Sequence, residues 1–151
     1  MILKRITASD DLATLVNEIN AAVWDDANEM STYDEASLRT YLAHPDTLFV
    51  TCHRSDEQGP TLLGFASCRF ELKPYEKLRW LYVDEVDVCA DQRRQGAGKA
   101  IMQKLLEIAE EQGCDEVWLG TEVDNDAANG LYRSLDPDDV GDVVGYTWET
   151  D

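Results

Sequence analysis

Three basic side chains and two glycines lie close together between residues 93 and 99, in a chain whose formal net charge is −18. A glycine turn that opens a helix leaves backbone N–H groups without intrahelical partners, in front of the positive end of the helix dipole. Such a turn binds anions, because glycine lets the main chain approach them and nearby cations add charge. We therefore expect a pyrophosphate-binding turn made by Arg93, Arg94, Gln95, Gly96, Ala97, Gly98 and Lys99.

The segments on either side of this turn have the patterns of a strand and a helix. Residues 80–88 are rich in aromatic and β-branched side chains, which favours a strand. Residues 100–112 place Ile101, Leu105 and Ile108 at helical spacing. The order strand, glycine turn and helix favours an anion site over the alternative, which is a solvated glycine loop.

Two motifs resemble those of the GNAT N-acetyltransferases. Residues 93–98 fit the acyl-CoA signature of that family, which is Gln or Arg, two free positions, Gly, one free position, then Gly or Ala. A predicted strand at 117–121 is followed by a second pattern of the family, formed by Asn125, Ala128 and the pair Leu131-Tyr132. Because both residue types and spacing agree, the resemblance predicts an acetyl-CoA-dependent N-acetyltransferase.

The resemblance implies a role for each matching segment. Asn125 would hydrogen-bond the pantetheine arm of acetyl-CoA, with Ala128 in the same motif, and Tyr132 would protonate the leaving thiolate. The alternative for Tyr132 is a core aromatic whose hydroxyl happens to find a partner. Exposed backbone groups at the end of the strand would pair with pantetheine as an added strand, and an N–H there would polarise the thioester carbonyl. These backbone groups belong to Val86, Asp87 and Val88.

An acetyltransferase also needs a base, because an amine is mostly protonated at neutral pH. Strand alternation puts Val83, Glu85 and Asp87 on one face and Asp84 on the other, unless a bulge changes the register. We expect Glu85 to be catalytic, because this stretch is similar to aminoglycoside 3-N-acetyltransferases, which carry a carboxylate at the matching place. A substrate-anchoring role for Glu85 stays equally open, and Asp84 and Asp87 are the reserve candidates for the base.

The family also places an acceptor wall between its first two helices, and the matching residues here are polar and aromatic. For any one of them, a solvated loop with one buried tryptophan is the simpler interpretation. Carboxylates at the strand ends complete the set. The predicted substrate-binding residues are Trp24, Asp25, Asp26, Glu29, Tyr33, Asp84, Glu122 and Asp124.

The remaining sequence supplies the other elements of one domain, which we expect over residues 1–151. The fold class predicted from their order is α/β, the GNAT fold, with a mixed, mostly antiparallel central sheet flanked by about four helices. Ser9 is expected to cap the first helix, and Thr32 and Glu35 to form a capping box for the second. The predicted strands are 2–6, 47–54, 61–70, 80–88, 117–121 and 140–148, with helices at 9–23, 32–44, 100–112 and from 125, and turns at 55–60 and 73–76.

Composition excludes several classes of partner. A pI near 4.2 argues against nucleic acid, and no apolar stretch approaches a membrane span. Two histidines without ligand spacing and four cysteines without a C-x-x-C pair predict no metal and no disulfide, so we expect a cytoplasmic protein with buried, structural thiols. The acidity fits either solvation at high salt or attraction of a cationic substrate. A homodimer through the last predicted strand is the oligomer to test.

The sequence therefore predicts direct acetyl transfer, in a ternary complex, to a primary amine of a small cationic acceptor such as an aminoglycoside or a polyamine. The first alternative is a non-catalytic module that only senses acyl-CoA, and another is an acetyltransferase of protein or peptide N-termini. A dinucleotide-binding domain is less favoured, because the full G-x-G-x-x-G turn near the first strand is missing.

Overall fold

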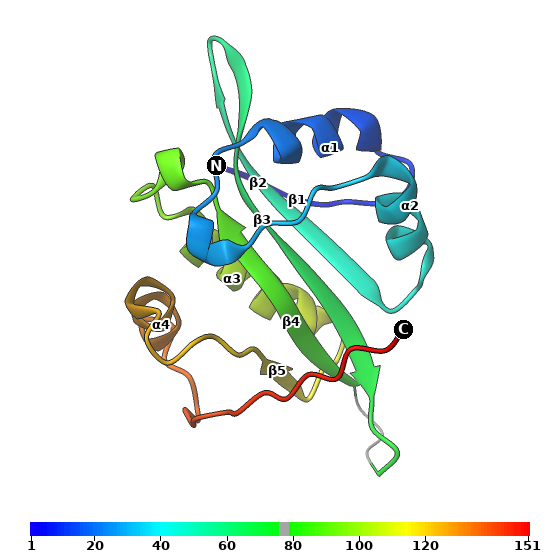
Figure 1. Cartoon of the computed structure of the whole chain (residues 1–151), viewed down its shortest axis with the longest axis vertical. Helices are drawn as coiled ribbons and strands as arrows, with labels where there is room; N and C mark the ends of the chain where they lie inside the picture. Colours follow the sequence, from blue (N-terminus) through cyan, green and yellow to red (C-terminus); the bar gives the residue numbers. More distant parts are fainter. Residues whose placement is uncertain (76–78) are drawn as a thin grey trace. The chain divides into compact units, whose positions relative to one another are not determined.

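The computed structural model describes residues 1–75 and 79–151 (Figure 1). It separates into two compact units, Met1–Leu119 and Gly120–Asp151. The single domain expected for residues 1–151 stays a prediction, and each unit is described by itself. The turn expected at 73–76 includes Glu76, which lies outside the described residues. In the part of the chain that the structure describes, no helix has both the length and the apolar character needed to cross a membrane.

The unit Met1–Leu119 is built on a five-stranded sheet in the order β1-β2-β3-β4-β5. The first four strands are antiparallel to their neighbours, whereas β5 is parallel to β4. This arrangement confirms the predicted mixed, mostly antiparallel sheet. The strands are β1 (Ile2–Arg5), β2 (Thr47–Asp56), β3 (Gly59–Leu72), β4 (Arg79–Val88) and β5 (Glu116–Trp118).

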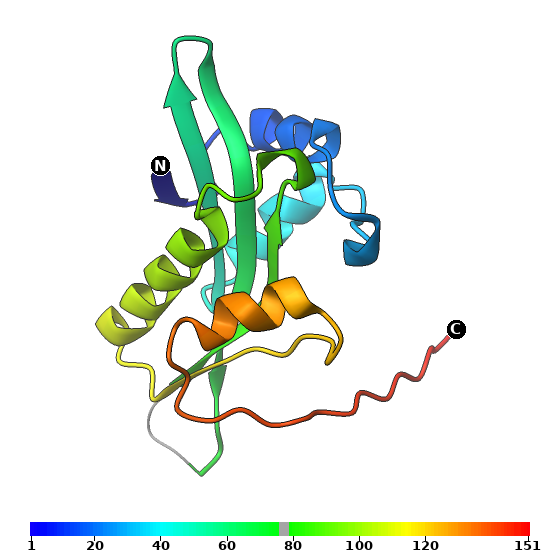
Figure 2. The ribbon, with the colours of Figure 1, turned by 90° about the vertical axis from the view of Figure 1, so that its left-hand side faces the viewer.

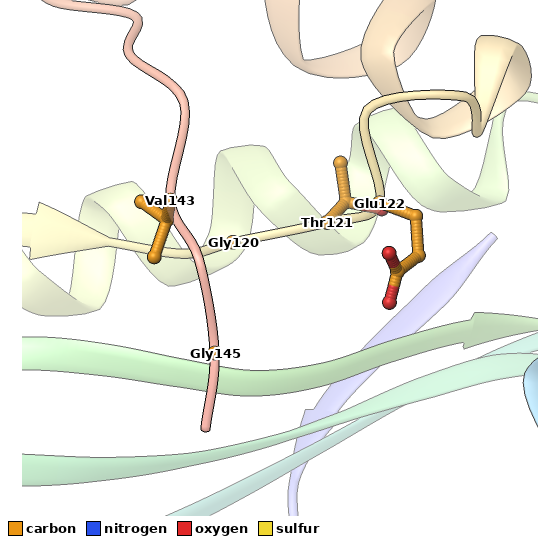
Figure 3. A pocket seen from close by; sticks show the side chains of 5 residues that line it. All are labelled: Gly120, Thr121, Glu122, Val143 and Gly145. Carbon is orange, nitrogen blue, oxygen red and sulfur yellow. The ribbon is translucent and has the colours of Figure 1, made fainter.

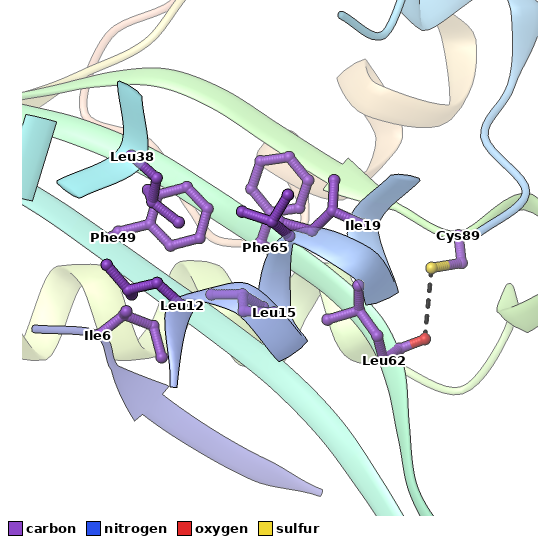
Figure 4. Packing of buried hydrophobic residues seen from close by; sticks show 10 residues of the cluster. Ile6, Leu12, Leu15, Ile19, Leu38, Phe49, Leu62, Phe65 and Cys89 are labelled. Carbon is purple, nitrogen blue, oxygen red and sulfur yellow. Dashed lines mark hydrogen bonds between the residues drawn. The ribbon is translucent and has the colours of Figure 1, made fainter. Parts of the chain in front are cut away.

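Helices cover both faces of this sheet (Figure 2). The helices α1 (Leu12–Ala21) and α2 (Glu35–Ala43) pack on one face, and α3 (Ala97–Glu111) lies on the other. Between the sheet and the first two helices, the rings of Phe49 and Phe65 stack at 5.2 Å in a core that includes Leu15, Ile19 and Leu38 (Figure 4). On the other face, α3 buries a stripe at helical spacing, formed by Ala97, Ile101, Met102, Leu105, Ile108 and Ala109.

The starts of both N-terminal helices differ from the prediction. The N-cap of α1 is Asp11, whose carboxylate accepts the N–H of Thr14 at 3.1 Å, whereas Ser9 bonds with the Thr7 hydroxyl. The N-cap of α2 is Asp34, which accepts the N–H of Ser37 at 2.9 Å. The expected cap at Ser9 and the expected capping box of Thr32 and Glu35 are therefore wrong. In each case an aspartate further along the chain supplies the capping oxygen.

Several other boundaries also change. The hairpin between β2 and β3 turns through two residues, because Asp56 pairs with Gly59, so the six-residue turn predicted at 55–60 is wrong. The helix α3 starts at Ala97 rather than at residue 100, and β5 ends at Trp118. Residues 140–148 form no strand among the described residues. Gly141 and Gly145 interrupt the apolar pattern of that segment, which weakens its strand preference.

Candidate functional site

A bulge in β4 separates the two halves of that strand. The register between β3 and β4 shifts between Ser67 and Cys68, which lie opposite Glu85 and Val83 respectively. Asp84 is consequently an extra residue on β4. Past the bulge, the alternation of side chains is inverted relative to a regular strand.

The bulge turns two carboxylates onto the α1 and α2 face of the sheet. Residues directly opposite each other on antiparallel strands share a face. Asp87 lies opposite Phe65, and Glu85 is two residues before it, so both share the face on which Phe65 packs under α1. Val83 lies opposite Cys68 on the other face, so the expectation that Val83, Glu85 and Asp87 share one face is wrong. The stated exception, that a bulge could change the register, is confirmed.

Glu85 and Asp87 form a carboxylate pair in contact with Tyr33. The Tyr33 hydroxyl donates a hydrogen bond to Glu85. Burial, and then the charges of Glu85 and Asp87, raise the pKa of Tyr33 above its ordinary range. Burial, followed by the charge of Asp84, raises the pKa of Glu85, and the bond from Tyr33 lowers it in part. Burial, followed by the charge of Glu85, raises the pKa of Asp87 from 3.8 to about 6.

Among the described residues, a basic side chain pairs with only one of the three neighbouring acids. The guanidinium of Arg69 donates from Nε to both carboxylate oxygens of Asp84, each at 3.2 Å. Within residues 1–75 and 79–151, neither Glu85 nor Asp87 makes an ion pair. Asp84 is therefore satisfied by the protein itself, whereas the pair retains charge for a bound cation.

The backbone of the same half of β4 is exposed along one edge. β5 pairs with β4 only at Trp80–Tyr82, so the edge beyond residue 83 that faces away from β3 has no strand partner in the described chain. On the β3 side the approach is unusually close. A Cβ built on Gly64 would lie 2.5 Å from the Asp87 carbonyl oxygen and 3.2 Å from the Val88 Cα. Glycine at position 64 thus sets the position of the strand end.

The turn after β4 has the backbone of an anion site. Arg94 has φ 64° and Gly96 has φ 80°, so left-handed residues alternate in the turn, which makes successive N–H groups converge. Gly96 is the N-cap of α3 and has no side chain to cap the first turn. The first intrahelical bond of α3 is from Ala100 N–H to the Gly96 carbonyl oxygen at 3.0 Å. The amides of residues 97–99 are therefore directed at the turn.

Side chains in the turn divide into two groups. Arg94 and Lys99 are exposed and make no ion pair in the part of the chain described. Arg93, by contrast, donates from Nη2 to Asp25 Oδ2 at 2.7 Å. Gln95 accepts from Arg54 at 2.6 Å and donates to the Gln92 side chain at 3.0 Å. The side chains of Arg93 and Gln95, expected to bind the cofactor, are thus used to hold the turn.

The predicted acceptor wall is also partly structural. Trp24 donates from Nε1 to the Ile19 carbonyl oxygen at 2.8 Å and packs edge-on against Phe65 at 5.4 Å. Asp25 is half-buried against Arg93. Of the remaining candidates in this region, Asp26 and Glu29 are exposed and Tyr33 contacts the carboxylate pair.

The unit Gly120–Asp151 holds the second motif on α4 (Asp126–Arg133). Asn125 is the N-cap, and its Oδ1 accepts the Ala128 N–H at 3.1 Å, so the two predicted cofactor residues bond to each other. Tyr132 lies in the last turn of the same helix. The Asn129 amide donates to the carbonyl oxygens of Glu122 and Asn125 at 3.0 and 2.8 Å. Local capping thus accounts for much of the Asn125 pattern.

A small open pocket of about 230 Å³ lies in this unit, where the C-terminal segment crosses residues 120–122 (Figure 3). Glu122, a predicted substrate residue, lines it, and the exposed Asp124 does not. The other lining residues are Gly120, Thr121, Val143 and Gly145.

Three contacts near predicted site residues, two in the first unit and one in the second, were not predicted from the sequence. Arg54 orders the turn from β2, Asn129 closes the loop before α4, and Tyr33 bonds to Glu85 rather than simply lining a wall. Arg54 lies 41 residues from Gln95, so no local pattern relates them. The spacing of Asn129 from Asn125, one helical turn, is the only signal that could have identified it.

Two further chemical groups of the described residues are Cys89, the cysteine nearest the phosphate turn in the sequence, and the candidate metal ligands. Cys89 is buried and donates from Sγ to the Leu62 carbonyl oxygen at 3.3 Å (Figure 4). Burial, followed by the charge of Asp91, raises the pKa of the Cys89 thiol to about 11, so the thiolate is scarce at neutral pH. Across residues 1–75 and 79–151, no three side chains of His, Cys, Asp or Glu are grouped as a metal site.

Comparison with known proteins gives a family and a fold. The model of the acetyltransferase (GNAT) family matches residues 12–136. The chain is 30% identical over 91 residues to thialysine N-epsilon-acetyltransferase of Bos taurus, covering 60% of this chain and 53% of that protein. It is 31% identical over 119 residues to L-methionine sulfoximine/L-methionine sulfone acetyltransferase of Pseudomonas paraeruginosa, covering 76% and 63%. The chain spans about half the length of the mammalian relatives it matches.

Solved structures share the fold over nearly the whole chain. An aminoglycoside acetyltransferase from an uncultured soil metagenomic sample, in complex with sisomicin, superposes with a TM-score of 0.85 at 20% identity, covering 99% of this chain and 96% of that one. A ribosomal-protein-alanine N-acetyltransferase from Brucella melitensis biovar Abortus 2308 gives a TM-score of 0.69 at 20% identity, covering 99% and 98%. At these identities the likeness establishes the fold alone.

Proposed function

The chain belongs to the acetyltransferase (GNAT) family, and on this premise we propose that it transfers an acetyl group from acetyl-CoA to a primary amine of a small cationic acceptor. One observation carries the proposal. β4 ends in two carboxylates that no described cation neutralises, Glu85 and Asp87, and leads directly into a turn whose amides converge on an anion. A proton acceptor beside a phosphate turn is the combination that acyl transfer from a nucleotide thioester to an amine requires.

The turn fits the phosphates of the donor. The amides of residues 97–99 and the cations of Arg94 and Lys99 would hold the diphosphate. The open edge of β4 at residues 86–88 would pair with the amides of the pantetheine arm. When bound, acetyl-CoA supplies the acetyl thioester. A backbone N–H on the same edge would polarise its carbonyl oxygen.

The carboxylate pair would prepare the amine. The Glu85 side chain is partly accessible, and its carboxylate would take the proton from the bound ammonium group, while Tyr33 holds that carboxylate in place. The charge of Glu85 would help to keep Asp87 protonated, because burial and this like charge raise the pKa of Asp87 to about 6. Because burial raises the pKa of Glu85, its carboxylate is closer to the operating pH than an ordinary one, which suits proton transfer.

Tyr132 would return a proton, from its hydroxyl, to the sulfur that leaves. This role rests on the motif shared with the family, Asn125 to Tyr132. We propose direct attack of the amine rather than an acetyl-enzyme, since the buried Cys89 thiol is a poor nucleophile.

A cationic acceptor is favoured by charge. The chain has 31 acidic and 13 basic residues, and such an excess attracts cations to a site that already holds unneutralised carboxylates. Proteins similar to this chain are named for thialysine, for L-methionine sulfoximine and for aminoglycosides, all of which carry amines. An aminoglycoside-like or polyamine-like acceptor is therefore our first choice, and a protein N-terminus is the second, on the likeness to a ribosomal-protein-alanine N-acetyltransferase. We place the reaction in the cytoplasm because the four cysteines are free thiols, as in a reducing compartment.

Thiol release from acetyl-CoA tests the proposal directly. The assay runs the chain against aminoglycosides, polyamines, amino acids and peptides, at low and at multimolar salt. We expect rapid release with one class of amine, intersecting initial-velocity lines, and a lower turnover with unchanged acetyl-CoA binding in Tyr132→Phe. Acetyl-CoA binding without release for any amine would favour the sensor alternative, and a ping-pong pattern would contradict direct transfer.

A further inference from the structure

Two contacts join the segment between α1 and α2 to the turn before α3. Arg93 donates to the Asp25 carboxylate over 2.7 Å, although the two residues are 68 positions apart in the sequence. The Ala90 N–H donates to the Val23 carbonyl oxygen, also over 2.7 Å. Residues 22–30 include Trp24, Asp25, Asp26 and Glu29 of the predicted acceptor wall, and residues 93–99 are the predicted phosphate turn. The structure therefore links these two segments, which are far apart in the sequence, through two hydrogen bonds.

The two adjacent arginines of the turn have different environments. Arg94 is exposed and makes no ion pair among the described residues, so its guanidinium is available to a ligand. The guanidinium of Arg93 is 2.7 Å from a carboxylate of another segment. A phosphate held by the backbone of this turn would restrict the turn, and Arg93 with it, without a direct bond from Arg93 to the phosphate.

The segment of residues 22–30 is anchored at Trp24, and exposed side chains follow Asp25. Trp24 is anchored by its bond to the Ile19 carbonyl oxygen and by its contact with Phe65. The three-residue helix η1 (Asp26–Asn28) follows, and both Asp26 and Glu29 are exposed. Asp25 lies between these two parts and is the point at which the turn holds the segment.

We infer that Asp25 is a positioning residue: through its ion pair with Arg93, a diphosphate ligand bound at residues 93–99 orders residues 22–30. The inference rests on the proposed function, because it takes coenzyme A as the ligand. The link is reciprocal, so an acceptor that orders residues 22–30 also tightens coenzyme A binding.

The size of the effect follows from the exposure of the pair. The side chains of Arg93 and Asp25 are 48% and 37% exposed, so water and salt screen their attraction. Partly exposed pairs of this kind change an equilibrium by about twofold to fivefold. The coupling is therefore modest and decreases at high salt.

Amide hydrogen exchange measures the coupling without a known acceptor. Exchange of residues 22–30 is followed with and without saturating coenzyme A, whose affinity for each variant is determined by calorimetry. In the unmodified chain we expect coenzyme A to slow exchange of the segment by about twofold to fivefold. In Asp25→Asn, which leaves the phosphate turn unchanged, the slowing is lost although coenzyme A still binds. Asp26→Asn is the matched control, since it removes a neighbouring exposed charge and keeps the pair.

Each outcome separates the inference from the function. Slowing of equal size in Asp25→Asn and in the unmodified chain would overturn the inference, because the coupling would then not pass through this pair. Absence of slowing in the unmodified chain, with coenzyme A bound, would overturn it and leave the proposed function intact. Failure of the unmodified chain to bind coenzyme A would overturn both.

Discussion

The two halves of β4 are continuous in sequence but differ in their pairing: the first half has a strand on each side, and the second half has a described strand on one side only. In the first half, Trp80–Tyr82 pair with β5 on one side and with β3 on the other, and Arg79 forms an ion pair with Asp46 at 3.2 Å. In the second half, the strand pairs with β3 alone, and Glu85 and Asp87 have no ion-pair partner in the described residues. We propose that the site lies here, where backbone and side-chain groups have no pairing partner among the described residues, on a strand that is otherwise held firmly.

The bulge at Asp84 is the boundary between these halves. It places the carboxylates on the face of α1 and α2, next to Tyr33, instead of the face that α3 covers. The following predictions change the second half of β4, the bulge, or the β3 residue packed against that half, so they test whether the second half differs as described.

Glu85→Gln should have the largest effect on activity. It keeps the size of the side chain and removes the proton acceptor, so we expect turnover to fall by about 10²- to 10⁴-fold. Acetyl-CoA affinity should remain, because the phosphate turn is unchanged. Steady-state thiol release and calorimetry check both parts, and turnover within about threefold of the unmodified chain would leave Glu85 as an anchor at most.

Gly64→Ala should displace the second half of β4 from β3. The added Cβ meets the Asp87 carbonyl oxygen at 2.5 Å, which is backbone and cannot move independently of the strand. We expect the free energy of unfolding to fall by about 1–3 kcal/mol and acetyl-CoA binding to weaken. Denaturant unfolding and calorimetry measure these changes. Gly130→Ala is the control, because its Cβ meets nothing within 4 Å and should be neutral or slightly stabilising.

Asp87→Asn should stabilise the protein while impairing it. Because burial and Glu85 raise the native pKa of Asp87 from 3.8 to about 6, ionisation of this group opposes folding above pH 6, and the opposition disappears as the pH falls below about 4. The variant should therefore gain about 1–3 kcal/mol at pH 7 and lose that advantage between pH 6 and pH 4. Denaturant unfolding at several pH values shows the sign. An equally large advantage at pH 4 would contradict this origin.

Asp84→Asn should have the smallest effect. Its carboxylate is bound to Arg69 on the surface, with side chains 36% and 48% exposed, so the pair contributes about 0–1 kcal/mol. Turnover should stay within about twofold of the unmodified chain, since Asp84 only adds to the raised pKa of Glu85. A loss of turnover as large as that of Glu85→Gln would mean that the bulge, rather than the pair, carries the site.

Much of this arrangement follows from local pattern. The strand before the turn, the helix after it and the conformational need for Gly96 are all present in residues 80–112, because strand preference, helical spacing and a positive φ each leave a signal in sequence. The GNAT family match agrees with both motifs read from the sequence.

What the sequence did not reveal depends on register and on distant partners. No residue type marks the bulge at Asp84, since it arises from how β3 and β4 pair, so the expectation that Val83 shares a face with Glu85 and Asp87 is wrong. The same holds for the Arg93–Asp25 ion pair, which joins segments that only the tertiary fold brings together. The predicted N-caps were wrong for a simpler reason. Several acidic and hydroxyl side chains lie within a few residues of each helix start, and any of them could accept the first backbone N–H groups.

Titration of the Asp87 carboxyl by ¹³C NMR tests the central claim most directly, because it needs neither an acceptor nor an active variant. The account predicts a midpoint near pH 6 in the unmodified chain, and a lower midpoint in Glu85→Gln, where the like charge is removed. A midpoint close to 3.8 in the unmodified chain, unchanged in Glu85→Gln, would contradict the claim that the second half of β4 holds a poised, unneutralised carboxylate pair.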